Sequence, residues 1–123
     1  MKFLRTFDNW ANVESHADGS VIFSENEPAD ALFLVLDGEV ALSLRGEALS
    51  TEGRGALIGE MAIIGDTRRS ASATAIGEVR LARLTPDEFR ELVADNPEFS
   101  LHAMAELARR LRAVDRLLSA RIA

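Results

Sequence analysis

The sequence contains no cysteine, and its two histidines, His16 and His102, lie far apart along the chain. The absence of cysteine excludes disulfides, thiolate metal sites and cysteine nucleophiles. Two separated histidines argue against a histidine-rich metal centre. No nucleophile–base set and no carboxylate pair is placed for acid–base work, so we expect neither a metal nor catalysis.

Long apolar runs and a positive net charge are also missing. No stretch approaches the ~20 apolar residues of a membrane span, and Met1–Phe7 is too short and too mixed for a signal peptide. Lysine and arginine number 14 against 20 acidic residues, a net charge of −6, so broad electrostatic binding to nucleic acid is not expected. Without cysteine or leader, the cytoplasm is the expected location.

What is present suits one globular domain. The 123 residues are 47% hydrophobic and 28% charged, enough to bury a core without metal or disulfide staples. We therefore treat residues 1–123 as a single domain.

Short strands are predicted over the first two-thirds of the chain, about residues 11–84. All 8 glycines fall between Gly19 and Gly77, and we expect them to mark turns, among them Asp37-Gly38 and Gly77. Between the turns lie runs of strand character, and the alternation from Val40 to Leu44 places one face in a core. Short strands at this spacing predict a barrel or jelly roll.

The pattern becomes helical after Leu84. Thr85-Pro86-Asp87-Glu88 forms a capping box that predicts a short helix over 86–94. Asn96-Pro97 ends it and begins a long helix over 97–121. The fold class is thus mainly β with two C-terminal helices.

The long helix carries more apolar surface than one contact with a barrel needs. Its seam consists of Leu101, Met104, Ala108, Leu111, Leu118 and Ile122, with Asp115 in the gap. We expect this helix to pair with a second copy as a homodimer. The arginines 109, 110, 112, 116 and 121 are expected to form a solvated face.

Residues 58–75 carry the chemistry. A helix starting at Gly59 would present free backbone N–H groups to an anion, and Arg69 could supply a two-pronged donor. Glu60 fits beside an anion only if its partner is a neutral donor such as a sugar hydroxyl. An anion with a neighbouring hydroxyl describes the ribose-phosphate of a nucleotide.

This segment resembles the phosphate-binding cassette of cyclic nucleotide-binding domains. The match lies in Gly59-Glu60, Ala62-Ile63 and Arg69-Ser70-Ala71-Ser72, without a gap. The strand region upstream from Gly19 matches too, and the helix after Asn96-Pro97 is similar to the long C-terminal helix of the catabolite activator family. The resemblance implies a β-roll followed by a short helix and a long lid helix.

The resemblance also implies residue roles. Glu60 would accept a hydrogen bond from the ribose 2′-hydroxyl, and Arg69 would pair with an equatorial oxygen of the cyclic phosphate. The other expected ligand contacts are Gly59, the backbone near Met61, Ala62 and Ala71, and the Ser70 hydroxyl on the phosphate or purine.

The base pocket departs from the family pattern. Ile58 stands where many members have phenylalanine, and the helix positions expected near the base are Val114 and Asp115. Val114 cannot form a hydrogen bond, so polar recognition of the base would depend on Asp115 or Arg112.

The implied function is a non-catalytic module that binds a cyclic mononucleotide, with cAMP favoured over cGMP and no cofactor. Movement of the long helix would signal to an effector protein that the sequence does not identify. The chain ends at Ala123, where activator relatives continue into a helix-turn-helix, so a transcription factor and direct nucleic-acid contact are not expected. The alternative is a degenerate domain that binds no nucleotide and acts through its long helix.

Overall fold

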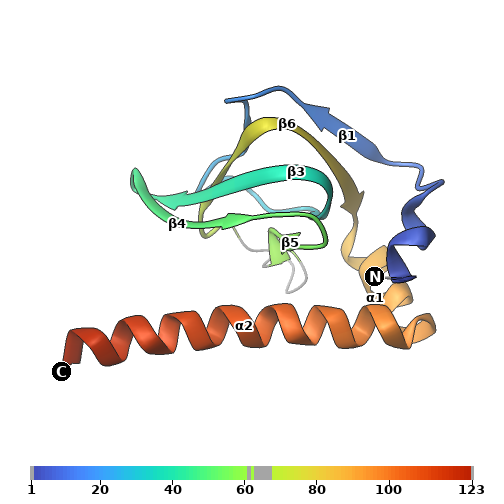
Figure 1. Cartoon of the computed structure of the whole chain (residues 1–123). Coiled ribbons are helices and arrows are strands. Elements are labelled where there is room, and N and C mark those ends of the chain that lie inside the picture. Colours follow the sequence, from blue (N-terminus) through green and yellow to red (C-terminus); the bar gives the residue numbers. More distant parts are fainter. Residues whose placement is uncertain (1, 61, 63–67, 123) are drawn as a thin grey trace.

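A computed structural model describes residues 2–60, 62 and 68–122, with the backbone alone at 114, 117, 118, 121 and 122. Figure 1 shows a roll of strands lying along one long helix. The elements, in chain order, are η1 (Lys2–Phe7), β1 (Val13–His16), β2 (Val21–Phe23), β3 (Leu32–Leu44), β4 (Glu47–Glu52), β5 (Leu57–Ile58), β6 (Ser72–Leu84), α1 (Pro86–Asp95) and α2 (Pro97–Ile122).

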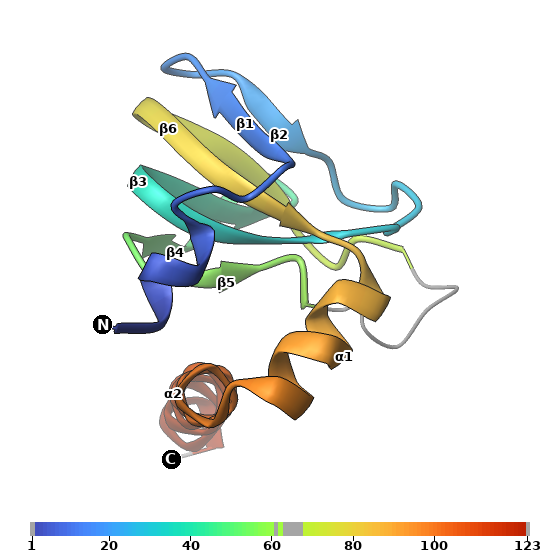
Figure 2. The ribbon, with the colours of Figure 1, turned by 90° about the vertical axis from the view of Figure 1, so that its right-hand side faces the viewer.

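Two long strands organise the roll. β3 and β6 each span 13 residues and pair with each other antiparallel. The sheet order is β1-β6-β3-β4, while β2 pairs with β6 and β5 pairs with β3. Figure 2 shows the short strands flanking this central pair and the helices at one end. The predicted fold class, a β-roll followed by a short and a long helix, is confirmed.

The predicted turns at Asp37-Gly38 and Gly77 are wrong. Both glycines lie inside the long strands, where the β3–β6 register shifts between Val35 and Asp37 and again between Asp37 and Glu39. Gly38 has φ +86° and a Cβ there would lie 2.4 Å from the Glu78 carbonyl oxygen. A glycine in the left-handed region permits such a bulge without ending the strand, which a local pattern does not distinguish from a turn.

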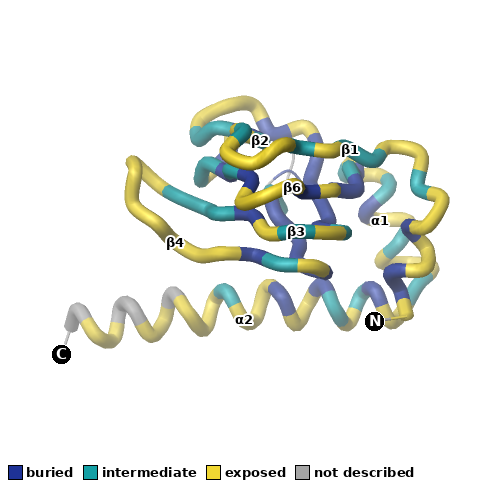
Figure 3. The backbone as a smooth tube through the Cα atoms, turned by 45° about the horizontal axis from the view of Figure 1, so that its top comes forward, coloured by how far each residue is buried: buried dark blue, intermediate teal, exposed yellow. Residues whose placement is uncertain are grey.

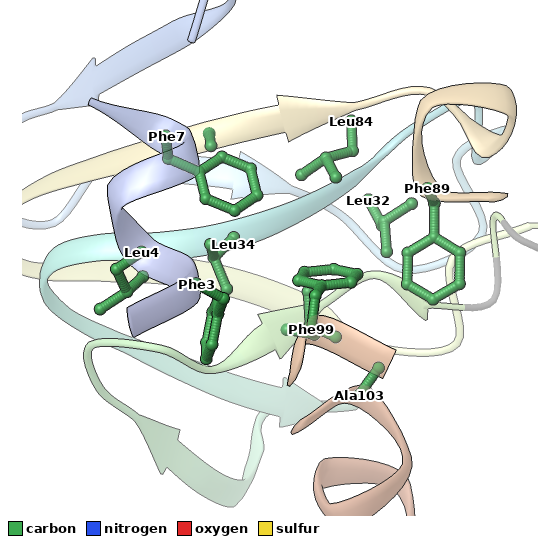
Figure 4. Close-up of a cluster of buried hydrophobic side chains, with 11 residues drawn as sticks. Phe3, Leu4, Phe7, Leu32, Leu34, Leu84, Phe89, Phe99 and Ala103 are labelled. Atoms are coloured by element: carbon green, nitrogen blue, oxygen red, sulfur yellow. The ribbon is translucent and has the colours of Figure 1, made fainter. Parts of the chain in front are cut away.

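The buried side chains form two clusters. One lies inside the roll and includes Phe23, Phe33 and Ile58. The other joins η1, the ends of β3 and β6, and both helices around Phe99, which is fully buried (Figure 4). Trp10 packs on this second cluster and its indole N–H donates to the Arg83 carbonyl oxygen at 2.9 Å. The N-terminal segment therefore closes one end of the roll.

Both helices begin at the predicted caps. The Thr85 hydroxyl accepts from the Glu88 N–H, and the Glu88 carboxylate accepts from the Thr85 N–H. The Phe99 N–H donates to the Asn96 side-chain oxygen at 3.1 Å. These local bonds fix where each helix starts and hence the direction in which α2 leaves the core.

The long helix α2 lies beside the roll and then continues past it (Figure 1). Phe99, Ala103 and Glu106 are buried on its inner face, while Leu101, Met104 and Leu111 are exposed. Figure 3 shows exposure rising along α2 away from the core end. In the described part of the chain, no helix combines the length and apolar character that crossing a membrane requires.

Candidate functional site

Five of the predicted ligand residues meet at one small cavity. Its lining consists of Phe23, Leu42, Gly59, Glu60, Arg69, Ser70 and Ala71, and its volume is about 40 Å³. A cavity needs ~10–15 Å³ of such space to hold one water, so this one has room for a few waters and not for a nucleotide. A wider hollow of about 370 Å³ lies beside η1, and none of the predicted site residues lines it. The predicted residues thus converge on one place, but a nucleotide needs that place to widen.

Arg69 is the charged centre of this cavity. Its side chain is buried, with the residue 5% exposed, and its guanidinium carbon lies 4.4 Å from the centre of the Phe23 ring. Nη1 donates to the Gly59 carbonyl oxygen at 3.4 Å, while Nε is buried without an acceptor among the described residues. Burial lowers the pKa of Arg69 and the nearby Asp30 carboxylate opposes that shift. A desolvated cation with a donor to spare is suited to an anion.

Gly59 makes the position of Arg69 possible. The residue has φ +74°, and a Cβ added there would lie 2.5 Å from Arg69 Nη1. The guanidinium therefore fills the space that any other side chain would occupy. The predicted helix start at Gly59 is a tight turn in the structure. Gly59 lies in the left-handed region, and its carbonyl oxygen accepts from the Ala62 N–H at 3.1 Å.

Glu60 has a partner that the sequence analysis did not assign. Its Oε2 lies 2.7 Å from Nη1 of Arg110 on α2. Within the described part of the chain this Nη1 makes no aligned hydrogen bond, so the contact is an ion pair. Arg110 Nη2 donates to the Leu57 carbonyl oxygen. The long helix therefore reaches the carboxylate that was predicted to hold the ribose.

The prediction that the arginines of α2 form a solvated face is wrong for Arg110, whereas Arg109 is 53% exposed as predicted and in addition forms ion pairs. The side chain of Arg110 is only 18% exposed. Arg109 donates to Glu52 at 2.9 and 3.2 Å and to Glu106 at 3.0 Å, and both carboxylates are buried. The hydrogen bond with Glu106, followed by the contacts with Glu52, raises the pKa of Arg109 despite some burial.

A helical pattern could have indicated these contacts. Phe99, Ala103, Glu106 and Arg110 follow one another at steps of four, three and four residues. Residues at such steps share one face of a helix, and Phe99 and Ala103 are apolar. Charged residues that continue a buried face require oppositely charged partners, which are Arg109 of the same helix for Glu106, and Glu52 and Glu60 for Arg110.

The other predicted positions divide into those at the cavity and those away from it. Ser70 is exposed and Ala71 is half-buried at the lining, while Ala62 is fully buried. Ile58 is fully buried in the roll core. Arg112 and Asp115 are exposed on α2 and do not line the cavity. Met61 and the Val114 side chain lie outside the described residues.

Arg68 differs from its neighbour. It is exposed and donates from Nη1 to the Asn26 carbonyl oxygen at 2.7 Å. Of the two adjacent arginines, Arg69 is thus the one turned into the cavity, in the register that the cassette pattern predicts.

Comparison with known proteins identifies the family. The family model described as "Cyclic nucleotide-binding domain" matches residues 13–96. The chain is 36% identical over 99 residues to the CRP-like cAMP-activated global transcriptional regulator of Mycobacterium tuberculosis, covering 76% of this chain and 44% of that protein. The chain belongs to the cyclic nucleotide-binding domain family.

Solved structures agree in fold. The catabolite activator protein of Thermus thermophilus superimposes with a TM-score of 0.74 at 33% identity, over 88% of this chain and 53% of that one. A structure described as "A cyclic-GMP-dependent signalling pathway regulates bacterial phytopathogenesis" gives a TM-score of 0.73 at 28% identity, over 89% of this chain and 91% of that one. The chain spans about half the length of the transcriptional regulator and the activator that it matches.

Proposed function

We propose that this chain is a regulatory module that binds a cyclic mononucleotide, cAMP in preference to cGMP, and catalyses no reaction itself. The observation that carries the proposal is the buried Arg69 guanidinium, whose Nε has no acceptor among the residues that the structure describes, in the same cavity as the Glu60 carboxylate. An equatorial phosphate oxygen would accept from Arg69, and the ribose 2′-hydroxyl would donate to Glu60. One ligand thus supplies the anion and the neutral donor that these side chains call for.

Recognition of the purine would come from fewer groups. The Ser70 hydroxyl is exposed beside the cavity and could donate to either the phosphate or a guanine. The preference for cAMP is supported by the relative from M. tuberculosis, which is described as cAMP-activated. The description of a similar solved structure names a cyclic-GMP-dependent signalling pathway, which makes cGMP the second candidate.

The ligand would act on α2 through Glu60. Arg110 of α2 already contacts this carboxylate, and the cavity of about 40 Å³ must widen before a nucleotide fits. Since Glu60 both lines the cavity and contacts Arg110 of α2, binding would shift the population of α2 positions. The shifted α2 population, in which Arg110 stays on Glu60, is the signal that an effector protein would detect.

The same helix would hold two copies together. Leu101, Met104 and Leu111 are 64%, 58% and 70% exposed along one side of α2. An apolar stripe of this kind on a long helix is typical of helix pairing. Residues 118 and 122 of the predicted seam lie outside the described side chains. A second copy is the partner that we assign to this stripe.

Thermal melting tests the proposed ligand. The melting temperature should rise with cAMP and, to a smaller extent, with cGMP. Ligand at a hundredfold excess over Kd stabilises the folded state by ~2.7 kcal/mol. No shift with either nucleotide at millimolar concentration would contradict the proposal and favour a domain that acts through its helix alone.

A further inference from the structure

Glu52, the last residue of β4, is a buried carboxylate outside the cavity. It is 3% exposed and accepts hydrogen bonds from Arg109 Nη2 at 2.9 and 3.2 Å. Its Oε1 also lies 3.6 Å from Arg110 Nε. A carboxylate removed from water needs such cations, because a buried charge without a partner is strongly unfavourable. Glu52 thus draws two adjacent arginines of α2 onto the roll.

Arg110 connects Glu52 to the ligand cavity. One edge of its guanidinium, at Nε, faces Glu52, and Nη1 lies 2.7 Å from Glu60 Oε2. The side chain is 18% exposed, so solvent screens these attractions little. Because the guanidinium is rigid and planar, the position of its Nε edge determines that of its Nη1 edge. A change of charge at Glu52 is therefore felt at Glu60.

We propose that Glu52 is a positioning residue for ribose recognition: through Arg110, it holds the Glu60 carboxylate where it accepts the 2′-hydroxyl of a cyclic nucleotide. The inference rests on the proposed function. Glu52 itself is not among the residues that line the cavity, so it would not contact the ligand directly. Its effect is confined to ligands that carry the hydroxyl.

A purely structural role for Glu52 makes a different prediction. If Glu52 only anchors α2 through Arg109, its loss loosens the helix and weakens every nucleotide by the same factor. If Glu52 acts through Arg110 and Glu60, its loss weakens cAMP and leaves 2′-deoxy-cAMP nearly unchanged. The ratio of the two affinities separates these roles.

The experiment is calorimetric titration of wild-type protein and Glu52→Gln with cAMP and with 2′-deoxy-cAMP. Glutamine keeps the shape and one acceptor for Arg109 but removes the charge. We expect cAMP affinity to fall by about tenfold, the equivalent of ~1.4 kcal/mol, with less than a threefold change for 2′-deoxy-cAMP. Glu106→Gln is the matched control, because Glu106 is equally a buried partner of Arg109, and it should leave the ratio unchanged.

A second variant protects the test if Glu52→Gln folds poorly. Arg110→Gln removes the connecting cation and should reduce the preference for cAMP over 2′-deoxy-cAMP by itself. With Arg110→Gln in place, adding Glu52→Gln should change the ratio no further, since the two act in one series. An equal loss for both nucleotides in Glu52→Gln, or an unchanged ratio in Arg110→Gln, would overturn the inference. A wild type that binds neither nucleotide would overturn the proposed function and the inference with it.

Discussion

The Arg69 guanidinium is a buried cation held by an aromatic ring and a carbonyl oxygen. A cation over the face of an aromatic ring gains ~0.5–2 kcal/mol, less than the cost of removing a charge from water. Its pKa is accordingly lowered by burial. A cyclic phosphate would supply the full negative charge that Phe23 and Gly59 do not. This imbalance is the physical reason for placing an anion here.

Substituting the two adjacent arginines one at a time tests which of them holds the phosphate. Arg69→Ala should lose most of the cAMP binding. Arg69→Lys should recover part of that loss, because lysine keeps the charge but lacks the planar fork. Arg68→Ala removes the same charge from an exposed side chain and should cost less than about tenfold in cAMP affinity. Equilibrium titration measures both. A larger loss in Arg68→Ala than in Arg69→Ala would mean that the cassette is shifted by one residue.

Gly59→Ala should reduce cAMP affinity by about tenfold or more, equivalent to at least ~1.4 kcal/mol. The new Cβ would lie 2.5 Å from Arg69 Nη1, so the guanidinium must leave its place on Phe23. Gly19→Ala is the control, since Gly19 has a similar φ of +79° and no atom within 4 Å of an added Cβ. Both variants should lose about 1–2 kcal/mol of stability from the left-handed backbone. Equal cAMP affinities in the two would contradict the proposed placement of Arg69.

At the level of elements, the features that local chemistry determines were predictable. The Thr85 capping box and the Asn96 cap depend on residues within three positions, and both form as predicted. The glycines in β3 and β6 were assigned to turns because a positive φ suits a turn and a bulge alike. Only the pairing of the two 13-residue strands decides between them, and that pairing is not local.

In the candidate site, too, some contacts follow from a local sequence pattern and others depend on how distant segments pack. The cassette from Gly59 to Ala71 is one contiguous stretch of sequence, and its pattern predicts Glu60 and Arg69 as ligand residues. The contact of Glu60 with Arg110 joins residues 50 positions apart, counting from 60 to 110, and the stacking of Arg69 on Phe23 joins β2 to the cassette. Such pairs follow from how the elements pack, which no spacing in one segment specifies.

The exposed stripe of α2 leads to a prediction about assembly. Leu111→Glu should convert a dimer into a monomer, because it places a charge at the most exposed member of the stripe, which is 70% exposed. Val21→Glu is the control, since Val21 is 60% exposed but lies on β2. Sedimentation velocity distinguishes the two states. A wild-type protein that remains monomeric at high concentration, with and without cAMP, would contradict the pairing of α2.

On the scale of the whole molecule, a cluster of charged residues links the cavity to the long helix through Glu60. Glu52, Glu60 and Glu106 meet Arg109 and Arg110 where α2 lies along the roll. In the function proposed above, a ligand that engages Glu60 would act on the helix directly through Arg110. The core around Phe99 holds the beginning of α2 in place against the roll.

Calorimetric titration of wild-type protein and Arg69→Ala with cAMP tests the central claim most directly. The wild type should bind with a Kd in the micromolar range or tighter, about −8 kcal/mol. Arg69→Ala should bind roughly thirty- to several-thousand-fold more weakly, since losing one partner of a buried charge pair costs ~2–5 kcal/mol, while its melting curve shows that it still folds. Equal affinity in the two proteins, or no heat of binding in the wild type, would contradict the claim that Arg69 holds a cyclic phosphate.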